Sequence, residues 1–151
     1  MAMANVDFLL NPIAFSSLRY DLAAADAAYV LAFKVQEVFF NELFSGFAGN
    51  RPIKIVANHS EELVLRQLMR AHQQLEAYVW SKNRLFHSKI IALPSIGVVH
   101  IGSHNLTRYA YTSAFNTTVR VHNIMFVNNI VSMINNCAKL ARGLNPWQPE
   151  E

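Results

Sequence analysis

The chain has 151 residues, 52% of them hydrophobic and 15% charged, which excludes a disordered protein and suits one domain rather than two. The net charge of +3 and the isoelectric point of about 9.2 are compatible with a nucleic-acid or phosphate partner without requiring one. The single cysteine, Cys137, excludes an internal disulfide. No stretch reaches the ~18 consecutive apolar residues of a membrane span. Residues 1–15 lack the basic start of a signal peptide, so we expect a soluble, cytoplasmic protein with no membrane partner.

Apolar patterning predicts strands that alternate with helices over the first half of the chain. Apolar, β-rich runs predict strands at 6–12, 28–35, 51–60, 76–81, 86–93, 97–103 and 116–123. Helical spacing predicts helices at 16–28, 36–50, 60–75 and 126–143. Ser60 is the expected N-cap of the third helix. The order predicts a mixed α/β fold of one domain, residues 1–151, with a loosely ordered tail from about 144 to 151.

The fifth and sixth predicted strands carry polar side chains that could form one site. Alternation along the fifth strand places His87 and Lys89 on one face. The sixth strand ends at Gly102, which permits close backbone approach, and Ser103 and Asn105 follow with a hydroxyl and an amide for an anion. If the two strands pair, these groups lie at the same end of the sheet.

With these residues in this order, the sequence resembles the phospholipase D superfamily. The signature of that superfamily is H-x-K, an Asp after four further residues, and then G-S-x-N. The predicted elements also resemble the layout of its small single-motif members, the Nuc-type endonucleases and the nuclease domain of BfiI-like restriction enzymes, over roughly residues 6–142. The resemblance implies a mixed sheet flanked by helices on both faces, with one half-site per chain.

Two positions depart from the family's pattern. Pro94 stands where the motif has its Asp, which argues against a lipase, and BfiI-like nucleases depart at the same Asp. Asn116 stands where an acidic residue usually orients the histidine, and tyrosyl-DNA phosphodiesterases are similar in carrying an amide there in one half. An amide oxygen accepts from an imidazole without a charge, so we expect weaker activation of the histidine.

The resemblance implies a phosphohistidine mechanism. His87 would attack phosphorus, and Lys89 and Asn105 would hold the non-bridging oxygens. Ser103 would form a hydrogen bond at the floor of the site, and Asn116 would fix the imidazole tautomer. A second histidine must protonate the leaving oxygen, so one H-x-K per chain implies a homodimer with a shared two-fold site. No metal and no other cofactor is implied.

Four further residues are candidate substrate-binding residues. His59 follows the apolar run 53–58 of the third predicted strand, on the loop expected to face the same sheet end. Lys82, Arg84 and Arg108 flank the motif residues and could form a basic rim for a phosphate backbone, the alternative for each being a solvated charge. His104 alternates away from the motif side chains, so we expect it to be packed rather than catalytic.

Three functional hypotheses follow. The first is a metal-independent phosphodiesterase, an endonuclease that cleaves DNA in preference to RNA. The second is a catalytically weakened nucleic-acid-binding or interaction protein of the same fold, supported by Pro94 and Asn116. The third is a phospholipase, which the small size argues against, because lipid-directed members carry two motifs in one long chain.

Overall fold

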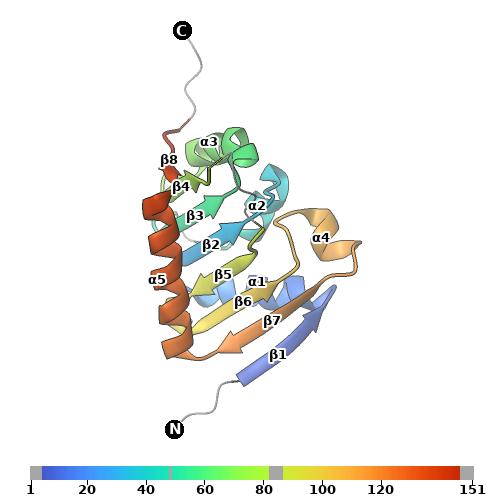
Figure 1. Cartoon of the computed structure of the whole chain (residues 1–151). Coiled ribbons are helices and arrows are strands. Elements are labelled where there is room, and N and C mark those ends of the chain that lie inside the picture. Colours follow the sequence, from blue (N-terminus) through green and yellow to red (C-terminus); the bar gives the residue numbers. More distant parts are fainter. Residues whose placement is uncertain (1–4, 48, 82–86, 147–151) are drawn as a thin grey trace.

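A computed structural model describes residues 5–47, 49–81 and 87–146 (Figure 1). An eight-stranded sheet runs through the molecule in the order β1-β7-β6-β5-β2-β3-β4-β8. The strands are β1 (Asn5–Leu10), β2 (Ala28–Ala32), β3 (Ile53–Ala57), β4 (Leu75–Val79), β5 (Ile90–Leu93), β6 (Val98–Gly102), β7 (Thr117–His122) and β8 (Arg142–Gly143). Strands β2, β3 and β4 are parallel to one another, and every other pairing is antiparallel. The predicted mixed α/β fold is confirmed.

Helices cover both faces of this sheet (Figure 1). They are α1 (Ile13–Ala24), α2 (Glu37–Leu43), α3 (Glu62–Ala71), α4 (Arg108–Thr112) and α5 (Ile124–Leu140), with short 3₁₀ turns η1 (His59–Glu61) and η2 (Pro94–Ile96). The larger core lies between the sheet and α1, α2 and α3, whose buried side chains include Leu18, Phe40 and Leu65. The smaller core lies under α5, where Val127 and Ile134 contact the opposite face. None of the helices in the described ranges is long and apolar enough to cross a membrane.

Several boundaries differ from those predicted. Strand β5 begins at Ile90, so His87 and Lys89 precede the strand instead of alternating within it. The predicted Ser60 cap is wrong, because Glu61 is the N-cap of α3 and the Ser60 hydroxyl instead donates to the Glu61 carboxylate at 3.1 Å. Helix α4 and strand β8 were not predicted, since each is too short to show a periodic pattern.

The C-terminal segment begins as part of the sheet. Strand β8 pairs with β4, and the Leu144 side chain is buried. The Leu144 N–H donates to the Ala77 carbonyl oxygen at 2.9 Å. Residues 147–151 of the predicted tail lie outside the described residues.

A buried ionic cluster fixes α1 against β6 and β7. The Asp21 carboxylate lies 2.7 Å from His100 Nε2 and accepts hydrogen bonds of 2.7 and 3.0 Å from the Arg120 guanidinium. Burial alone raises the pKa of Asp21, but the bonds from His100 and Arg120 outweigh it and the pKa is lowered. His100, which the sequence presents as an ordinary strand residue, is therefore a structural partner of a buried carboxylate.

Candidate active site

The candidate site lies at one end of the sheet, where strands of opposite direction meet (Figure 1). Strand β2 ends there, and its antiparallel neighbour β5 begins there. Because β6 is antiparallel to β5, and β7 is antiparallel to β6, strand β6 ends and strand β7 begins at that edge. The H-x-K segment and the S-x-N segment therefore lie side by side, as the sequence suggested.

Gly102 sets the distance between β6 and β7 at this edge. Its N–H donates to the Lys89 carbonyl oxygen at 3.2 Å, which extends the pairing of β5 with β6 beyond the last ladder pair. On the other side, a Cβ at this position would lie 2.2 Å from the Thr117 carbonyl oxygen and 2.7 Å from the Thr118 Cα. Both atoms belong to the backbone, so only glycine permits this approach.

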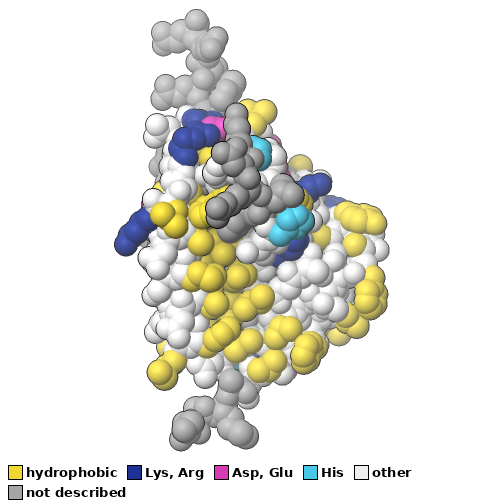
Figure 2. Space-filling model, viewed as in Figure 1, with side chains coloured by type: hydrophobic (Ala, Val, Ile, Leu, Met, Phe, Trp, Pro, Cys, Tyr) yellow, Lys and Arg dark blue, Asp and Glu magenta, His cyan; other side chains and the backbone are white. Residues whose placement is uncertain are grey.

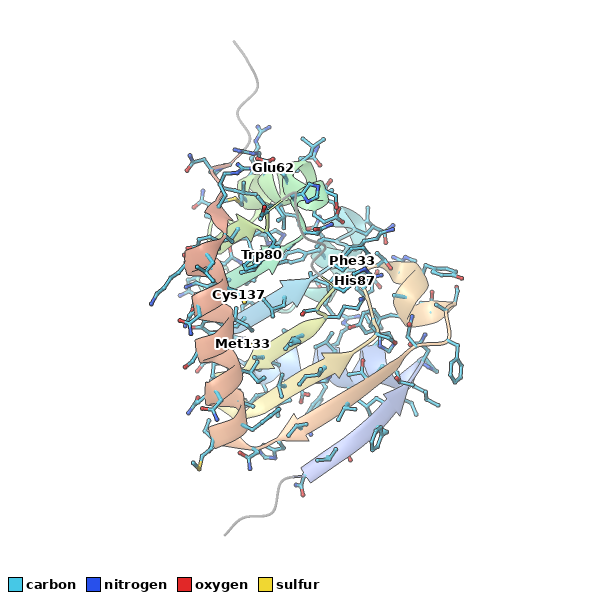
Figure 3. The ribbon with its side chains drawn as sticks, in the orientation of Figure 1. Phe33, Glu62, Trp80, His87, Met133 and Cys137 are labelled. Carbon is cyan, nitrogen blue, oxygen red and sulfur yellow. The ribbon has the colours of Figure 1, made fainter. Side chains whose placement is uncertain are left out.

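Phe33, just after β2, is the centre about which the H-x-K residues pack. The His87 imidazole is exposed and stacks on the Phe33 ring, with centroids 4.1 Å apart and planes 15° from parallel (Figure 3). The Lys89 and Lys34 ammonium groups lie 5.3 and 5.9 Å from the centroid of the same ring, within cation–π range. An exposed imidazole and two cations thus surround one aromatic platform.

Lys89 is held close to His87 by its own side chain. The Lys89 ammonium donates to the His87 carbonyl oxygen at 2.8 Å. Burial lowers the pKa of Lys89 from its ordinary value. The Lys89 side chain is half-buried, so less water must be displaced when an anion binds its ammonium.

Backbone bonds bring Asn105 to the same platform. The Leu106 N–H donates to the Lys34 carbonyl oxygen at 3.1 Å, and the Gln36 N–H donates to the Leu106 carbonyl oxygen at 2.8 Å. Asn105 also lines a narrow hollow with Lys89 and Gly102 that has room for about one water molecule. The structure therefore collects His87, Lys89 and Asn105 at one point of the sheet edge.

Ser103 and Asn116 form a separate hydrogen-bonded pair beside this point. The Ser103 hydroxyl donates to Asn116 Oδ1 at 2.8 Å and accepts from the Thr117 N–H at 3.0 Å. Asn116 Nδ2 donates to the Ala110 carbonyl oxygen of α4 at 3.0 Å. Among the residues described here, no hydrogen bond joins Asn116 to His87. The expected role of Asn116 in fixing the imidazole stays a prediction.

Unsatisfied polar atoms gather at the same edge. Within the described ranges, three buried side-chain atoms have no hydrogen-bond partner: Asn58 Oδ1, His59 Nδ1 and Asn105 Oδ1. Asn58 and His59 follow β3, and Asn105 follows β6. Buried polar groups in native proteins are nearly always hydrogen-bonded. Several unpaired polar atoms at one edge therefore indicate a place where a ligand or water supplies the partners.

The predicted substrate-binding residues are distributed as follows. His59 lies in η1 at the site end of β3. Arg108 is exposed, but its guanidinium lies 2.5 Å from the Glu42 carboxylate, so its charge is already paired. Lys82 and Arg84 lie outside the described residues.

His104 is packed, as its alternation suggested. Its two ring nitrogens lie 2.6 Å from Thr118 Oγ1 and 2.7 Å from Asn11 Oδ1, and the ring stacks on Tyr111.

In the part of the chain that the structure describes, no group of three His, Cys, Asp or Glu side chains could hold a metal ion.

Phe33 is the site residue that sequence reasoning missed. It falls at the end of a predicted buried strand, where an aromatic side chain is expected in the core. The signal lies in the pairing: β2 and β5 are antiparallel with Leu31 opposite Ile90, which brings the residue after β2 beside the residues before β5. This register between β2 and β5 can be used only once the order of the strands in the sheet is known.

Solved structures share this fold. Nuc from Salmonella typhimurium, a phospholipase D family member, is 16% identical, with a TM-score of 0.76 over 95% of this chain and 99% of that one. NucT from Helicobacter pylori is 12% identical, with a TM-score of 0.75 over 94% of this chain and 100% of that one. The archaeal chromatin protein TrmBL2 is 13% identical, with a TM-score of 0.65 over 92% of this chain and 54% of that one. No protein-family model and no curated protein matches the sequence.

These likenesses define the class of fold. The chain has the phospholipase D superfamily fold in its Nuc-type form, a mixed sheet flanked by helices on both faces. The predicted fold class is confirmed, because Nuc and NucT are each covered almost from end to end, and the expected half-site in each chain stays a prediction.

Replacing Gly102 by alanine tests the close approach at this edge. We expect Gly102→Ala to lower the free energy of unfolding by about 1–3 kcal/mol, because the new methyl group must push the β7 backbone away. Gly143→Ala is the matched control, since a Cβ there meets only the Tyr78 ring at 3.5 Å, and it should change stability by less than about 1 kcal/mol. Urea unfolding measures both, and equal stabilities for the two variants would contradict the account.

Proposed function

We propose that the protein is a metal-independent phosphodiesterase that cleaves nucleic acid, with DNA as the preferred substrate. One observation carries the proposal: an exposed imidazole, His87, lies on the same aromatic ring as the Lys89 ammonium, at an edge of the sheet where Asn105 lines the same narrow hollow as Lys89. A nucleophile, a fixed cation and an amide are the groups that attack on a phosphodiester requires.

The fold supports the choice of a phosphodiester. Nuc is described as a phospholipase D family member, and TrmBL2 as an archaeal chromatin protein with a novel mode of DNA binding. The same fold therefore occurs in a protein that binds DNA. The net charge of +3 suits a polyanionic substrate.

In the proposed first step, a ring nitrogen of neutral His87 attacks phosphorus. A P–N bond forms while the bond from phosphorus to the leaving oxygen breaks, and that oxygen takes a proton from a second, protonated histidine. The Lys89 ammonium and the Asn105 amide N–H stabilise the charge that builds on the non-bridging oxygens. In the second step, the now neutral second histidine removes a proton from water, the water oxygen bonds to phosphorus, and the P–N bond breaks.

The second histidine would come from another copy of the chain. Each chain has one H-x-K, and His104, the histidine of the S-x-N segment, is buried in hydrogen bonds to Thr118 and Asn11. His87 of the partner subunit, brought near by a two-fold axis, would act as acid and then as base.

An apolar surface beside the site suits such a partner. Paired residues of neighbouring strands point to one face, so Phe8, Val119 and Ile101 form a row that continues from the core under α5 to the edge strand β1. Phe8 is 79% exposed and Leu10 47% exposed, and Figure 2 shows hydrophobic side chains spread across this face. An apolar area of this kind usually marks an interaction site.

The apolar surface also reaches the candidate site. Leu10 of β1 lies opposite Thr117, and the Thr117 carbonyl oxygen accepts from the Ser103 N–H at 3.0 Å. A second copy seated on this face would therefore adjoin the site rather than bind at a distance from it.

A second candidate function is a nucleic-acid-binding protein of the same fold with weakened chemistry. The observation that favours it is the engagement of Asn116 with Ser103 and Ala110, which leaves the His87 imidazole without a hydrogen-bonded orienting group in the described residues. The exposed position of His87 argues for chemistry, since binding alone has no need of a free imidazole.

Cleavage of labelled DNA and RNA in excess EDTA distinguishes the two functions. We expect the wild-type protein to cleave under these conditions, His87→Ala to lose activity by on the order of 10³-fold or more, and Lys89→Ala by about 10²–10³-fold. Tyr20→Ala, an exposed aromatic position on α1, is the control and should keep full activity. Binding without cleavage by the wild-type protein would favour the second function, and equal cleavage by His87→Ala would exclude His87 as the nucleophile.

Placing a charge on the apolar surface tests the shared site. We expect Phe8→Asp to give a folded monomer that no longer cleaves, because a buried carboxylate opposes association. Tyr20→Asp changes an equally exposed aromatic residue elsewhere and should remain dimeric and active. Sedimentation equilibrium gives the oligomeric state and the EDTA assay gives the activity. Full cleavage by a monomeric protein would contradict a site built from two copies.

A further inference from the structure

A second hollow lies at the same end of the sheet, on the far side of β2 from β5. It is lined by His59, Val79, Trp80, Ser81, Leu140 and Arg142 and is named here the Trp80 pocket. Its volume is about 200 Å³. Pockets for drug-sized ligands run from ~300 to 1,000 Å³, so this one suits a single flat ring system.

The walls of the Trp80 pocket are apolar and aromatic. Val79 is buried, and the half-buried Trp80 packs against the core under α5. Leu140, in the last turn of α5, is 80% exposed and stands at the rim. A flat indole beside an aliphatic side chain is the kind of surface on which a base stacks, whatever its sequence.

His59 adds a polar group without a partner. Its Nδ1 atom is buried and accepts or donates no hydrogen bond in the described chain. An imidazole nitrogen can donate or accept according to tautomer, so it matches the mixed donors and acceptors on the edge of a nucleobase. The neighbouring Asn58 side chain is 3% exposed, and its Oδ1 is also unpaired.

The rim of the pocket carries a group of paired charges. The Arg142 guanidinium donates to the Glu62 carboxylate at 2.9 and 3.0 Å, and Arg66 donates to the same carboxylate at 2.9 Å. Hydrogen bonds from Arg142 and Arg66 lower the pKa of Glu62 to about 2, so the carboxylate stays ionised. The Glu61 carboxylate lies in the same short turn as His59 and accepts from the Val35 N–H at 2.8 Å, so two guanidinium groups near the pocket are balanced by two carboxylates.

The Trp80 pocket and the candidate site share one edge. Phe33, His59 and Trp80 follow the neighbouring parallel strands β2, β3 and β4, in that order. Neighbouring strands lie ~4.8 Å apart, so about 10 Å separates the end of β2 from the end of β4. A short run of unstacked nucleotides spans that distance.

We infer that the Trp80 pocket binds an unstacked nucleobase of the strand whose phosphate lies at His87, so that the substrate is single-stranded nucleic acid. This inference rests on the proposed function for its substrate class. A base in an intact duplex is stacked between its neighbours and cannot enter this pocket without being flipped out, at an energetic cost. Single strands present their bases freely.

Binding of three matched DNAs tests the inference apart from any cleavage. The full chain carrying His87→Ala is titrated, by fluorescence anisotropy, with a single-stranded oligonucleotide, its duplex, and the same strand with abasic sites. We expect the plain single strand to bind about 5- to 150-fold more tightly than the abasic strand, the range that stacking of one base gives. The duplex should also bind more weakly than the plain strand.

Two further measurements assign the effect to Trp80. Adding Trp80→Ala should remove most of the difference between plain and abasic strands, whereas adding Tyr20→Ala should preserve it. Because Trp80 packs on the core, its replacement can disturb folding, so a second test keeps it in place. The chain has two tryptophans, and in Trp147→Phe the fluorescence of Trp80 should be quenched by the plain strand and not by the abasic one.

The outcomes separate the two proposals. Selective binding of the plain strand with quenching of Trp80 supports the pocket, even if the wild-type protein cleaves nothing. Equal affinity for plain and abasic strands, or no quenching, overturns the pocket, even if the wild-type protein cleaves both in EDTA. Failure to bind any of the three DNAs overturns the pocket and the choice of DNA as substrate together.

Discussion

The candidate site depends on the contact between the β6 and β7 backbones at Gly102. The position has no room for a side chain, because a Cβ would lie 2.2 Å from the Thr117 carbonyl oxygen. On its other side, the Gly102 N–H holds the Lys89 carbonyl oxygen. One residue thus fixes the spacing of three antiparallel strands, and the H-x-K and S-x-N segments face one another as a result. The positions of the site side chains at this edge therefore depend on the close approach of the β6 and β7 backbones.

Around that constraint the groups divide into two sets with different roles. The Phe33 ring stacks on the His87 imidazole and lies within cation–π distance of Lys89 and Lys34, which places an exposed imidazole among cations. Ser103 and Asn116 are hydrogen-bonded to each other and to the backbone, so they brace the edge.

Much of the fold could be predicted from the sequence, because seven of the strands and four of the helices have clear periodic patterns. The H-x-K and G-S-x-N residues could also be placed at one sheet edge, since pairing of consecutive strands requires it. Phe33 could not be assigned, because its role depends on β2 lying next to β5, which is a long-range pairing. The Asp21–His100–Arg120 cluster joins residues 79 and 99 positions apart and leaves no local signal. The unpaired atoms of Asn58, His59 and Asn105 are visible only once burial is known.

The central claim is that His87 attacks phosphorus, and trapping the covalent intermediate tests it most directly. The protein would be mixed with a labelled single-stranded oligonucleotide under single-turnover conditions, quenched in alkali, which preserves phosphohistidine, and mapped by peptide mass spectrometry. The account predicts a nucleotidyl adduct on the peptide that contains His87, formed and lost at rates consistent with turnover, and absent in His87→Asn. Turnover at the same rate with no adduct, or an adduct on another residue, would contradict it.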